Sequence, residues 1–337
     1  MTASTGKHAV LAIGAATPRM IAALSSAFEL HLAWEQRDMA AFLGAQGPRI
    51  AGISTWGPEG VPARWMAAMP SLRIVSNYGV GYDAVDVAEA VRRGIVVTHT
   101  PGVLDNDTAN TAILLMLAVS RRLVRDDRWV RSGDWKRKGP PPLTRSIEGA
   151  RVGMVGMGRI GQTIARKLSA FGCHVAYHSR NPVPGLQWRH EPDLVALAAA
   201  SDYLVVIVPG GPATRHLVSR AVIEALGPQG TLVNIARGSV VDEAELVAAL
   251  CDGRLGAAAL DVFESEPDVP APLLAMDNVV LTPHVGSATE ETRRAMGDLT
   301  VENLLRYFAD GCVLTPVPEC RRLARICPAG PAAGRRP

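Results

Sequence analysis

Three side chains in the second half of the chain have the types that the reduction of a carbonyl group needs. They are Arg237, Glu266 and His284. Each follows an apolar run that predicts a parallel strand, so we expect all three at the carboxyl edge of one sheet, where such sheets bind ligands. A guanidinium can bind a carboxylate and polarise a carbonyl, and an imidazole, whose ordinary pKa is about 6.5, can deliver a proton at neutral pH. A glutamate bonded to the other ring nitrogen orients the imidazole and favours its protonated form. The set predicts reduction of a 2-keto acid.

Each of these residues also has a plainer interpretation when it is taken singly. An arginine after a strand is often a surface ion-pair residue, a glutamate before proline a solvated loop residue, and a histidine after proline a packed one. The catalytic interpretation depends on all three occurring in this order after a dinucleotide-binding pattern. No clustered set of metal ligands accompanies them, so we expect no metal.

A glycine-rich turn predicts the source of the hydride. Residues 156–161 read G-x-G-x-x-G, and the predicted cofactor contacts there are Gly156, Gly158, Arg159, Ile160 and Gly161. The turn directly follows a predicted strand and opens a predicted helix, which is the context that this otherwise weak pattern requires. The first glycine permits the tight turn, the second lets the backbone approach a pyrophosphate, and the third lets helix and strand pack closely. The alternative is a strand-to-helix turn that binds no ligand.

The end of the next predicted strand indicates which dinucleotide is bound. NAD enzymes place an acidic residue there to hold the ribose hydroxyls, but this chain has Ser179 and Arg180 instead. The hydroxyl could hydrogen-bond a 2′-phosphate and the guanidinium could pair with it. We therefore predict NADP(H), with NAD(H) less favoured. In the alternative interpretation, Arg180 is only a solvated residue at a strand end.

Apolar runs of strand length alternate with amphipathic helical stretches along the chain, which predicts parallel sheets built from βαβ units. The predicted strands are His8–Gly14, Glu29–Trp34, Ile50–Trp56, Arg73–Tyr78, Ile95–Thr98, Arg151–Val155, His174–His178, Tyr203–Val208, Gly230–Ile235, Ala257–Asp261 and Val279–Thr282. The predicted helices include Val85–Arg93, Asn106–Arg121, Ile160–Phe171, Asp193–Ala200, Arg220–Leu226, Glu243–Cys251 and Glu290–Phe308. The helix from Asn106 is apolar over most of its length, so we expect it to be buried all round.

These elements predict an α/β fold with two Rossmann-like or flavodoxin-like doubly wound parallel-sheet domains and a cleft between them. A discontinuous substrate domain would comprise residues 1–101 and 287–320, and the dinucleotide-binding Rossmann domain residues 102–286. The segment 321–337 is rich in Arg, Pro and Gly without periodicity, which predicts a mobile tail. The basic stretch between Arg121 and Arg145 is predicted to be a surface arm or linker.

Composition excludes several classes of protein. The chain has 337 residues, a net charge of +3 and 48% hydrophobic residues, which suits two packed domains and shows no footprint for nucleic acid. The five cysteines include no CxxC pair, so we expect no disulfide framework and a reducing, cytoplasmic environment. No signal peptide or membrane span is apparent, so we expect a soluble protein that binds no membrane.

Four motifs together resemble the D-isomer-specific 2-hydroxyacid dehydrogenase family, over about residues 77–318. They are the glycine turn, Asn234–Ser239, Leu260–Pro267 and Pro283–Thr289. By this resemblance Arg237, Glu266 and His284 are the catalytic residues, and the spacing from the arginine favours Glu266 over the neighbouring Glu264. The resemblance also implies a homodimer, in which residues 121–135 form the dimer arm.

The resemblance implies further binding residues. Those that would bind substrate are Val80, Gly81, Arg237 and His284, with the backbone N–H groups of the first two holding the carboxylate. Those that would contact the cofactor, besides the glycine turn and the Ser179–Arg180 pair, are Thr108, Val208, Pro209, Thr214, Ala236, Asp261 and Gly286. Asp261 resembles the family's aspartate near the nicotinamide carboxamide.

Within the family, three features are most similar to the hydroxypyruvate and glyoxylate reductase branch: the substrate loop Val80–Asp83, the Ser179–Arg180 pair and the ending Leu314–Val317. This favours NADPH-dependent reduction of hydroxypyruvate or glyoxylate to the D-2-hydroxy acid. The alternatives are reduction of a (hydroxy)phenylpyruvate or 2-ketogluconate, a sibling dehydrogenase of formate or phosphite, or an NADP-sensing protein of the corepressor type without catalysis.

Overall fold

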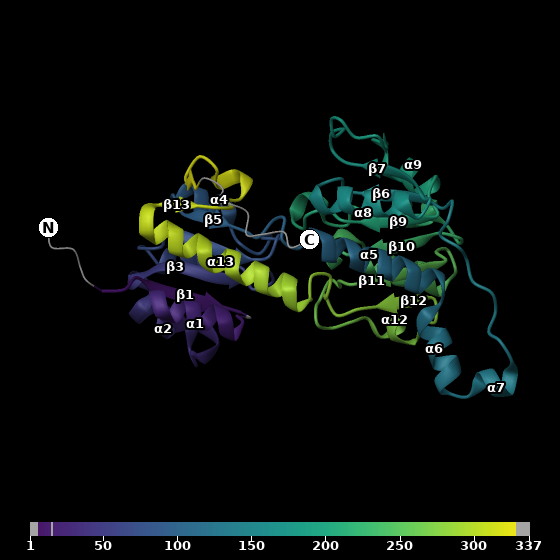
Figure 1. The fold of residues 1–337 in the computed structure, drawn as a ribbon, viewed down its shortest axis with the longest axis horizontal. Helices are drawn as coiled ribbons and strands as arrows, with labels where there is room; N and C mark the ends of the chain where they lie inside the picture. The colour runs from purple at the N-terminus through teal and green to yellow at the C-terminus, as the bar shows by residue number, and fades with distance from the viewer. Residues whose placement is uncertain (1–5, 15, 328–337) are drawn as a thin grey trace, which may run out of the picture. The chain divides into compact units, whose positions relative to one another are not determined.

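The computed structural model describes residues 6–14 and 16–327, and the chain divides into two compact units (Figure 1). The first unit comprises Met1–Leu104 and Thr289–Pro337, and the second comprises Asp105–Ala288. Each contains its own parallel sheet flanked by helices, so the predicted α/β fold is confirmed.

The first unit is built on a five-stranded parallel sheet in the order β2-β1-β3-β4-β5, which is the flavodoxin-like order. Its strands are β1 Ala9–Ile13, β2 Glu29–Leu32, β3 Ile50–Trp56, β4 Ile74–Tyr78 and β5 Val96–Thr98. Its helices are α1 Pro18–Ala27, α2 Met39–Gln46, α3 Ala63–Ala68, α4 Val87–Arg92 and α13 Glu290–Asp310. Helix α13 packs against β3, β4 and α1, so the chain's return joins the core of this unit.

The second unit is built on a seven-stranded parallel sheet in the order β8-β7-β6-β9-β10-β11-β12. The chain order reverses between β6 and β9, which is the switch point of a Rossmann fold. The strands are β6 Arg151–Val155, β7 His174–His178, β8 Arg189–His190, β9 Tyr203–Val206, β10 Thr231–Asn234, β11 Ala257–Leu260 and β12 Val279–Leu281. The helices are α5 Asp105–Ser120, α6 Leu123–Arg131, α7 Asp134–Lys138, α8 Arg159–Ala170, α9 Leu194–Ala199, α10 Arg220–Leu226, α11 Glu243–Cys251 and α12 Ala271–Ala275.

Helix α5 is not buried all round, contrary to the prediction from its sequence. It packs against α8 and against β10, β11 and β12, and one face carries buried side chains such as Leu115 and Met116. On the opposite face, Leu114 is 55% exposed. The prediction failed because apolar residues occupy the outward positions too, which hides the periodicity of the buried face.

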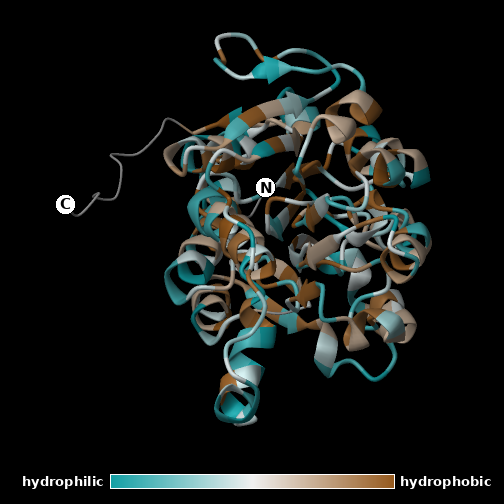
Figure 2. Cartoon of the chain, turned by 90° about the vertical axis from the view of Figure 1, so that its right-hand side faces the viewer, coloured by the Kyte–Doolittle hydropathy of each residue, from teal (hydrophilic) through white to brown (hydrophobic). Residues whose placement is uncertain are grey.

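The basic stretch that follows α5 forms two short helices that extend from the body of the second unit (Figure 1). Neither α6 nor α7 has a buried residue, although Leu123, Val130 and Trp135 are large exposed hydrophobic side chains. Figure 2 colours the central strands predominantly brown, as expected for buried apolar runs. Neither α6 nor α7 contributes a side chain to the hydrophobic core of the second unit.

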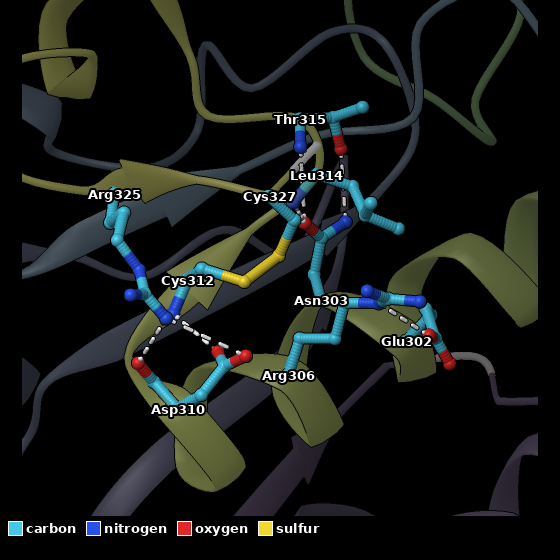
Figure 3. The surroundings of a disulfide bond; sticks show 9 residues. All are labelled: Glu302, Asn303, Arg306, Asp310, Cys312, Leu314, Thr315, Arg325 and Cys327. Atoms are coloured by element: carbon cyan, nitrogen blue, oxygen red, sulfur yellow. Dashed lines mark hydrogen bonds and ion pairs between the residues drawn. A yellow bond between two sulfur atoms is a disulfide. The ribbon is translucent and has the colours of Figure 1, made fainter. Parts of the chain in front are cut away.

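The prediction of a mobile tail is wrong for residues 321–327. Strand β14 (Arg325–Ile326) pairs in parallel with β13 (Cys312–Val313), and Cys327 forms a disulfide with Cys312 (Figure 3). Arg325 also donates to the carbonyl of Asp310 at 3.0 Å. The prediction of no disulfide is wrong for this pair; Cys173, Cys251 and Cys320 are free. The rest of the predicted tail, 328–337, lies outside the described residues.

Candidate active site

The glycine turn between β6 and α8 has the geometry that a bound pyrophosphate requires. Gly156 has a φ of +106°, and a Cβ there would stand 2.5 Å from the carbonyl oxygen of Ile207. A Cβ on Gly161 would stand 2.5 Å from the carbonyl oxygen of Gly156. Gly158, by contrast, has open space around it, and α8 begins there without a side-chain cap. The uncapped N–H groups and the open face fit a phosphate group.

The end of β7 carries a cation with no competing carboxylate. Arg180 is exposed, and within the described part of the chain its guanidinium forms no hydrogen bond or ion pair. Ser179 Oγ donates to the carbonyl of Asn181 at 2.6 Å, which shapes the turn and leaves the oxygen's lone pairs available. The site therefore offers positive charge where NAD enzymes offer a carboxylate.

The structure brings the predicted glutamate and histidine into direct contact. His284 Nδ1 lies 2.7 Å from Glu266 Oε2, and the second oxygen of the carboxylate accepts the N–H of Phe263 at 3.0 Å. Because an ionised carboxylate only accepts, Nδ1 carries the hydrogen. Nε2 forms no hydrogen bond in the described residues, and the histidine side chain is 35% exposed. This free nitrogen is the atom that can exchange a proton with a ligand.

Several contacts act in opposite directions on the pKa of Glu266. Burial alone raises it, but the hydrogen bond and charge of His284, the N–H of Phe263 and the charge of Arg237 together outweigh burial, so the pKa is lowered. The carboxylate therefore stays ionised and can stabilise a protonated imidazole. The influence of Arg237 also places the third predicted residue in the electrostatic field of this pair.

Glu266→Gln is expected to lower the stability of the chain at pH 5, where an imidazole is ordinarily protonated and a glutamate ionised, and to lower it less at pH 3. The lowered pKa means that the folded state binds the proton more weakly than the unfolded state, so the ionised form contributes stability above the ordinary pKa of glutamate, about 4.3. That contribution is lost as the pH falls through the lowered pKa. Thermal unfolding of both proteins at pH 5 and pH 3 measures the effect.

The matched control for this comparison is Glu148→Gln, at an exposed position. It should change the melting temperature little at either pH. If the gap between Glu266→Gln and the parent chain stayed constant or widened towards acid, the carboxylate would not be stabilised in its ionised form.

Asp261 holds the backbone that presents His284. Its carboxylate accepts the hydroxyl of Thr282 at 2.7 Å and the N–H groups of Val285 and Gly286 at 2.8 Å each. His284 itself has a φ of +52°, and its N–H donates to the carbonyl of Asp261 at 2.8 Å. A left-handed conformation is costly for a histidine, so these bonds offset the strain. The sequence indicated a cofactor contact for Asp261 and missed this second role.

The turn that carries Arg237 is closed by a residue to which the sequence gave no role. Asn234 Oδ1 accepts the N–H of Ala236 at 3.0 Å, and its Nδ2 donates to the carbonyl of Arg237 at 3.0 Å. The asparagine is the signal in the sequence that could have predicted this turn, because asparagine side chains commonly accept the backbone N–H two residues further on. The adjoining Gly238 packs directly on the backbone of Phe263, since a Cβ there would overlap the Phe263 carbonyl group.

The remaining predicted cofactor residues of the second unit follow strands of its sheet or begin α5. Thr214 Oγ1 donates to the carbonyl of Pro209 at 2.7 Å and closes the loop after β9, which contains Val208. Ala236 is buried. Thr108 is buried on α5, and its methyl carbon lies 3.7 Å from where a Cβ of Gly286 would stand. The neighbouring Thr111, which the sequence did not single out, donates to the Gly286 carbonyl at 3.1 Å. In the first unit, the predicted substrate residues Val80 and Gly81 lie on the loop after β4.

One solved structure and two relatives of known name are similar to this chain. The NADPH-dependent glyoxylate/hydroxypyruvate reductase from Sinorhizobium meliloti, solved in complex with NADP and malonate, is 48% identical with a TM-score of 0.89, covering 93% of this chain and 98% of that one. A hydroxyphenylpyruvate reductase from Plectranthus scutellarioides is 47% identical over 87% of this chain and 94% of its own length. A 2-ketogluconate reductase from Gluconobacter oxydans is 43% identical over 93% of this chain and 99% of its own length.

The Rossmann unit, its glycine turn and the Glu–His pair define an oxidoreductase that uses a nicotinamide dinucleotide. The family model described as "D-isomer specific 2-hydroxyacid dehydrogenase, NAD binding domain" matches residues 113–286. The chain belongs to the D-isomer-specific 2-hydroxyacid dehydrogenase family. Among the described residues, no helix combines the length and the apolar character needed to cross a bilayer.

Proposed function

We propose that this protein reduces a small 2-keto acid to the D-2-hydroxy acid with NADPH, and that hydroxypyruvate or glyoxylate is the preferred substrate. The observation that carries the proposal is the contact between His284 Nδ1 and Glu266 at 2.7 Å, which leaves Nε2 of the histidine free. Relatives named for reduction of glyoxylate, hydroxypyruvate and hydroxyphenylpyruvate support the same chemistry.

NADPH, when bound, supplies a hydride to the carbonyl carbon of the substrate. His284 Nε2 then donates a proton to the carbonyl oxygen, where negative charge develops. Glu266 holds the ring through Nδ1 and stabilises its protonated form before the transfer. Arg237 binds the substrate carboxylate through its planar guanidinium, and the backbone N–H groups of Val80 and Gly81 are the other proposed carboxylate ligands. In the reverse direction, the neutral histidine takes the hydroxyl proton.

We propose that the second unit binds the dinucleotide and that the first binds substrate. The glycine turn would hold the pyrophosphate, and Ser179 with Arg180 the 2′-phosphate. The remaining proposed cofactor contacts are Thr108, Arg159, Ile160, Val208, Pro209, Thr214, Ala236, Asp261 and Gly286. The similar reductase solved with NADP supports this choice of dinucleotide.

Arg180→Asp is expected to move the cofactor preference towards NADH. A charge-assisted hydrogen bond to phosphate contributes about 1.5–3 kcal/mol, so the ratio of kcat/KM with NADPH to that with NADH should fall by roughly ten- to a hundredfold or more. Initial rates with each dinucleotide measure the ratio. Arg37→Asp is the control, because it makes the same change of charge at an exposed position of the first unit that forms no ion pair within the described residues. A parent enzyme that prefers NADH would contradict the assignment.

A panel of substrates tests the proposed reaction. Hydroxypyruvate, glyoxylate, phenylpyruvate, hydroxyphenylpyruvate and 2-ketogluconate are each offered with NADPH and with NADH. We expect the highest kcat/KM for hydroxypyruvate or glyoxylate with NADPH. A preference for a larger keto acid would select one of the alternative reductases. Formate and phosphite are also tested as hydride donors with NADP⁺. If the protein binds NADPH tightly but turns over none of these compounds, a cofactor-sensing role is favoured.

We also propose a cytoplasmic homodimer. Helices α6 and α7 carry exposed apolar side chains, such as Val130, which is 57% exposed, and Trp135, which is 60% exposed. Such side chains support a protein contact there.

Sedimentation of the protein should give twice the mass of the chain. The double variant Trp135→Asp, Val130→Asp should sediment as a monomer. A disulfide such as Cys312–Cys327 is more typical of an oxidising compartment, so recovery of the protein in the cytoplasmic fraction of cells is the result that would support the proposed compartment.

A further inference from the structure

The loop after β4 has its backbone carbonyls tied back into the first unit. The carbonyl of Gly79 accepts the N–H of Thr100 at 3.0 Å and Asn77 Nδ2 at 3.0 Å. The carbonyl of Gly81 accepts the same Nδ2 at 3.0 Å. Between them, the carbonyl of Val80 lies 3.2 Å from a side chain, His99 Nδ1. Three successive carbonyls therefore have hydrogen-bond donors within the unit.

The N–H groups of the same loop are in the opposite situation. Val80 N and Gly81 N donate to no acceptor within residues 6–14 and 16–327. In a planar trans peptide the C=O and the N–H point in opposite directions. Fixing the Gly79 carbonyl therefore fixes the direction of the Val80 N–H, and fixing the Val80 carbonyl fixes that of the Gly81 N–H. Two adjacent N–H groups without an internal acceptor are available to bind an anion.

His99 is itself held firmly. Its N–H donates to the carbonyl of Thr315 at 3.1 Å, and Thr315 Oγ1 donates to the carbonyl of His99 at 2.6 Å. The hydroxyl of Thr315 in turn accepts Asn303 Nδ2 at 2.9 Å, a contact drawn in Figure 3. The ring of Tyr82 meets the imidazole edge to face, with centroids 5.4 Å apart. The ring that reaches Val80 is thus anchored to the segment after α13.

We propose that His99 is a positioning residue for substrate binding, because it orients the Gly81 N–H towards the substrate carboxylate by holding the Val80 carbonyl. This inference rests on the proposed function, which gives the loop its ligand. A carbonyl can only accept, so the bond requires the hydrogen on Nδ1. Without this bond the Val80–Gly81 peptide can rotate and present a carbonyl, which repels the carboxylate.

Three variants test whether the Nδ1 donor matters. His99→Leu removes it, His99→Gln places an amide one bond further out, and His99→Asn places Nδ2 close to the position of Nδ1. Losing one hydrogen bond to a charged group corresponds to a rise in the KM for glyoxylate of roughly ten- to a hundredfold, which we expect for Leu and Gln. Asn should recover most of the parent KM. The kcat at saturation and the Kd for NADPH should change less than threefold, by roughly the scatter expected of a neutral change.

A second measurement separates this inference from the proposed reaction. Binding of oxalate, a carboxylate analogue of glyoxylate, to the NADP⁺ complex is measured by calorimetry and needs no turnover. It should weaken in His99→Leu and His99→Gln and recover in His99→Asn. If the leucine variant does not fold, the comparison of Gln with Asn decides. Equal oxalate affinity and KM in all folded variants would overturn the role of His99, whereas an inactive parent chain would overturn the proposed function.

Discussion

His284→Ala is expected to remove most turnover while leaving NADPH binding nearly unchanged. Because Nδ1 of the imidazole contacts Glu266, Nε2 is the nitrogen available to donate a proton. General acid catalysis by such a group typically contributes about 10²–10⁴-fold to the rate. Its side chain contacts Glu266, whereas the glycine turn proposed for the pyrophosphate follows β6. The kcat for hydroxypyruvate and the fluorescence-measured Kd for NADPH are the two readouts.

His174→Ala is the matched control, since this exposed histidine stands at the opposite, amino end of β7. It should retain both turnover and cofactor binding. Loss of turnover together with loss of NADPH binding in His284→Ala would show that the histidine is structural. Retention of more than a tenth of the parent kcat would contradict its role as the proton donor.

Much of the second unit could be predicted because its strands are continuous apolar runs bounded by turn residues. The bounds of β6 and β7 match the predicted Arg151–Val155 and His174–His178, and those of α10 and α11 match as well. The contact between Glu266 and His284 could also be anticipated. Parallel strands bring their carboxyl ends to one edge, so residues distant in sequence converge whenever each follows a strand.

The parts that could not be predicted depend on contacts without a local pattern. Cys312 and Cys327 come together because α13 ends at Asp310, with Gly311 as its cap, and β14 pairs beside β13. No spacing in the sequence indicates that pairing. The network around Asp261 is equally hidden, since one buried carboxylate there accepts from three donors along residues 282–286. A family resemblance identifies such a residue but does not show which backbone it holds.

Gly238→Ala is expected to lower both kcat and stability, although it adds only one carbon. The new Cβ would overlap the carbonyl carbon and oxygen of Phe263 and the nitrogen of Glu264, all of them backbone atoms that cannot rotate away. Overpacking of this kind costs about 1–3 kcal/mol and occasionally more. The two segments that must separate carry Arg237 on one side and Glu266 on the other. Relief of the overlap therefore moves the guanidinium away from the Glu–His pair.

The expected result for Gly238→Ala is a fall in kcat/KM for hydroxypyruvate of at least roughly a hundredfold, because a misplacement of about 1 Å in a catalytic group has that effect. The melting temperature should fall as well. Gly44→Ala in α2 is the control, since its Cβ would meet nothing within 4 Å and alanine favours a helix over glycine by about 1 kcal/mol. That variant should be as active as the parent and at least as stable. If Gly238→Ala were as active and as stable as Gly44→Ala, the close packing of Gly238 on Phe263 would not set the distance between Arg237 and the Glu–His pair.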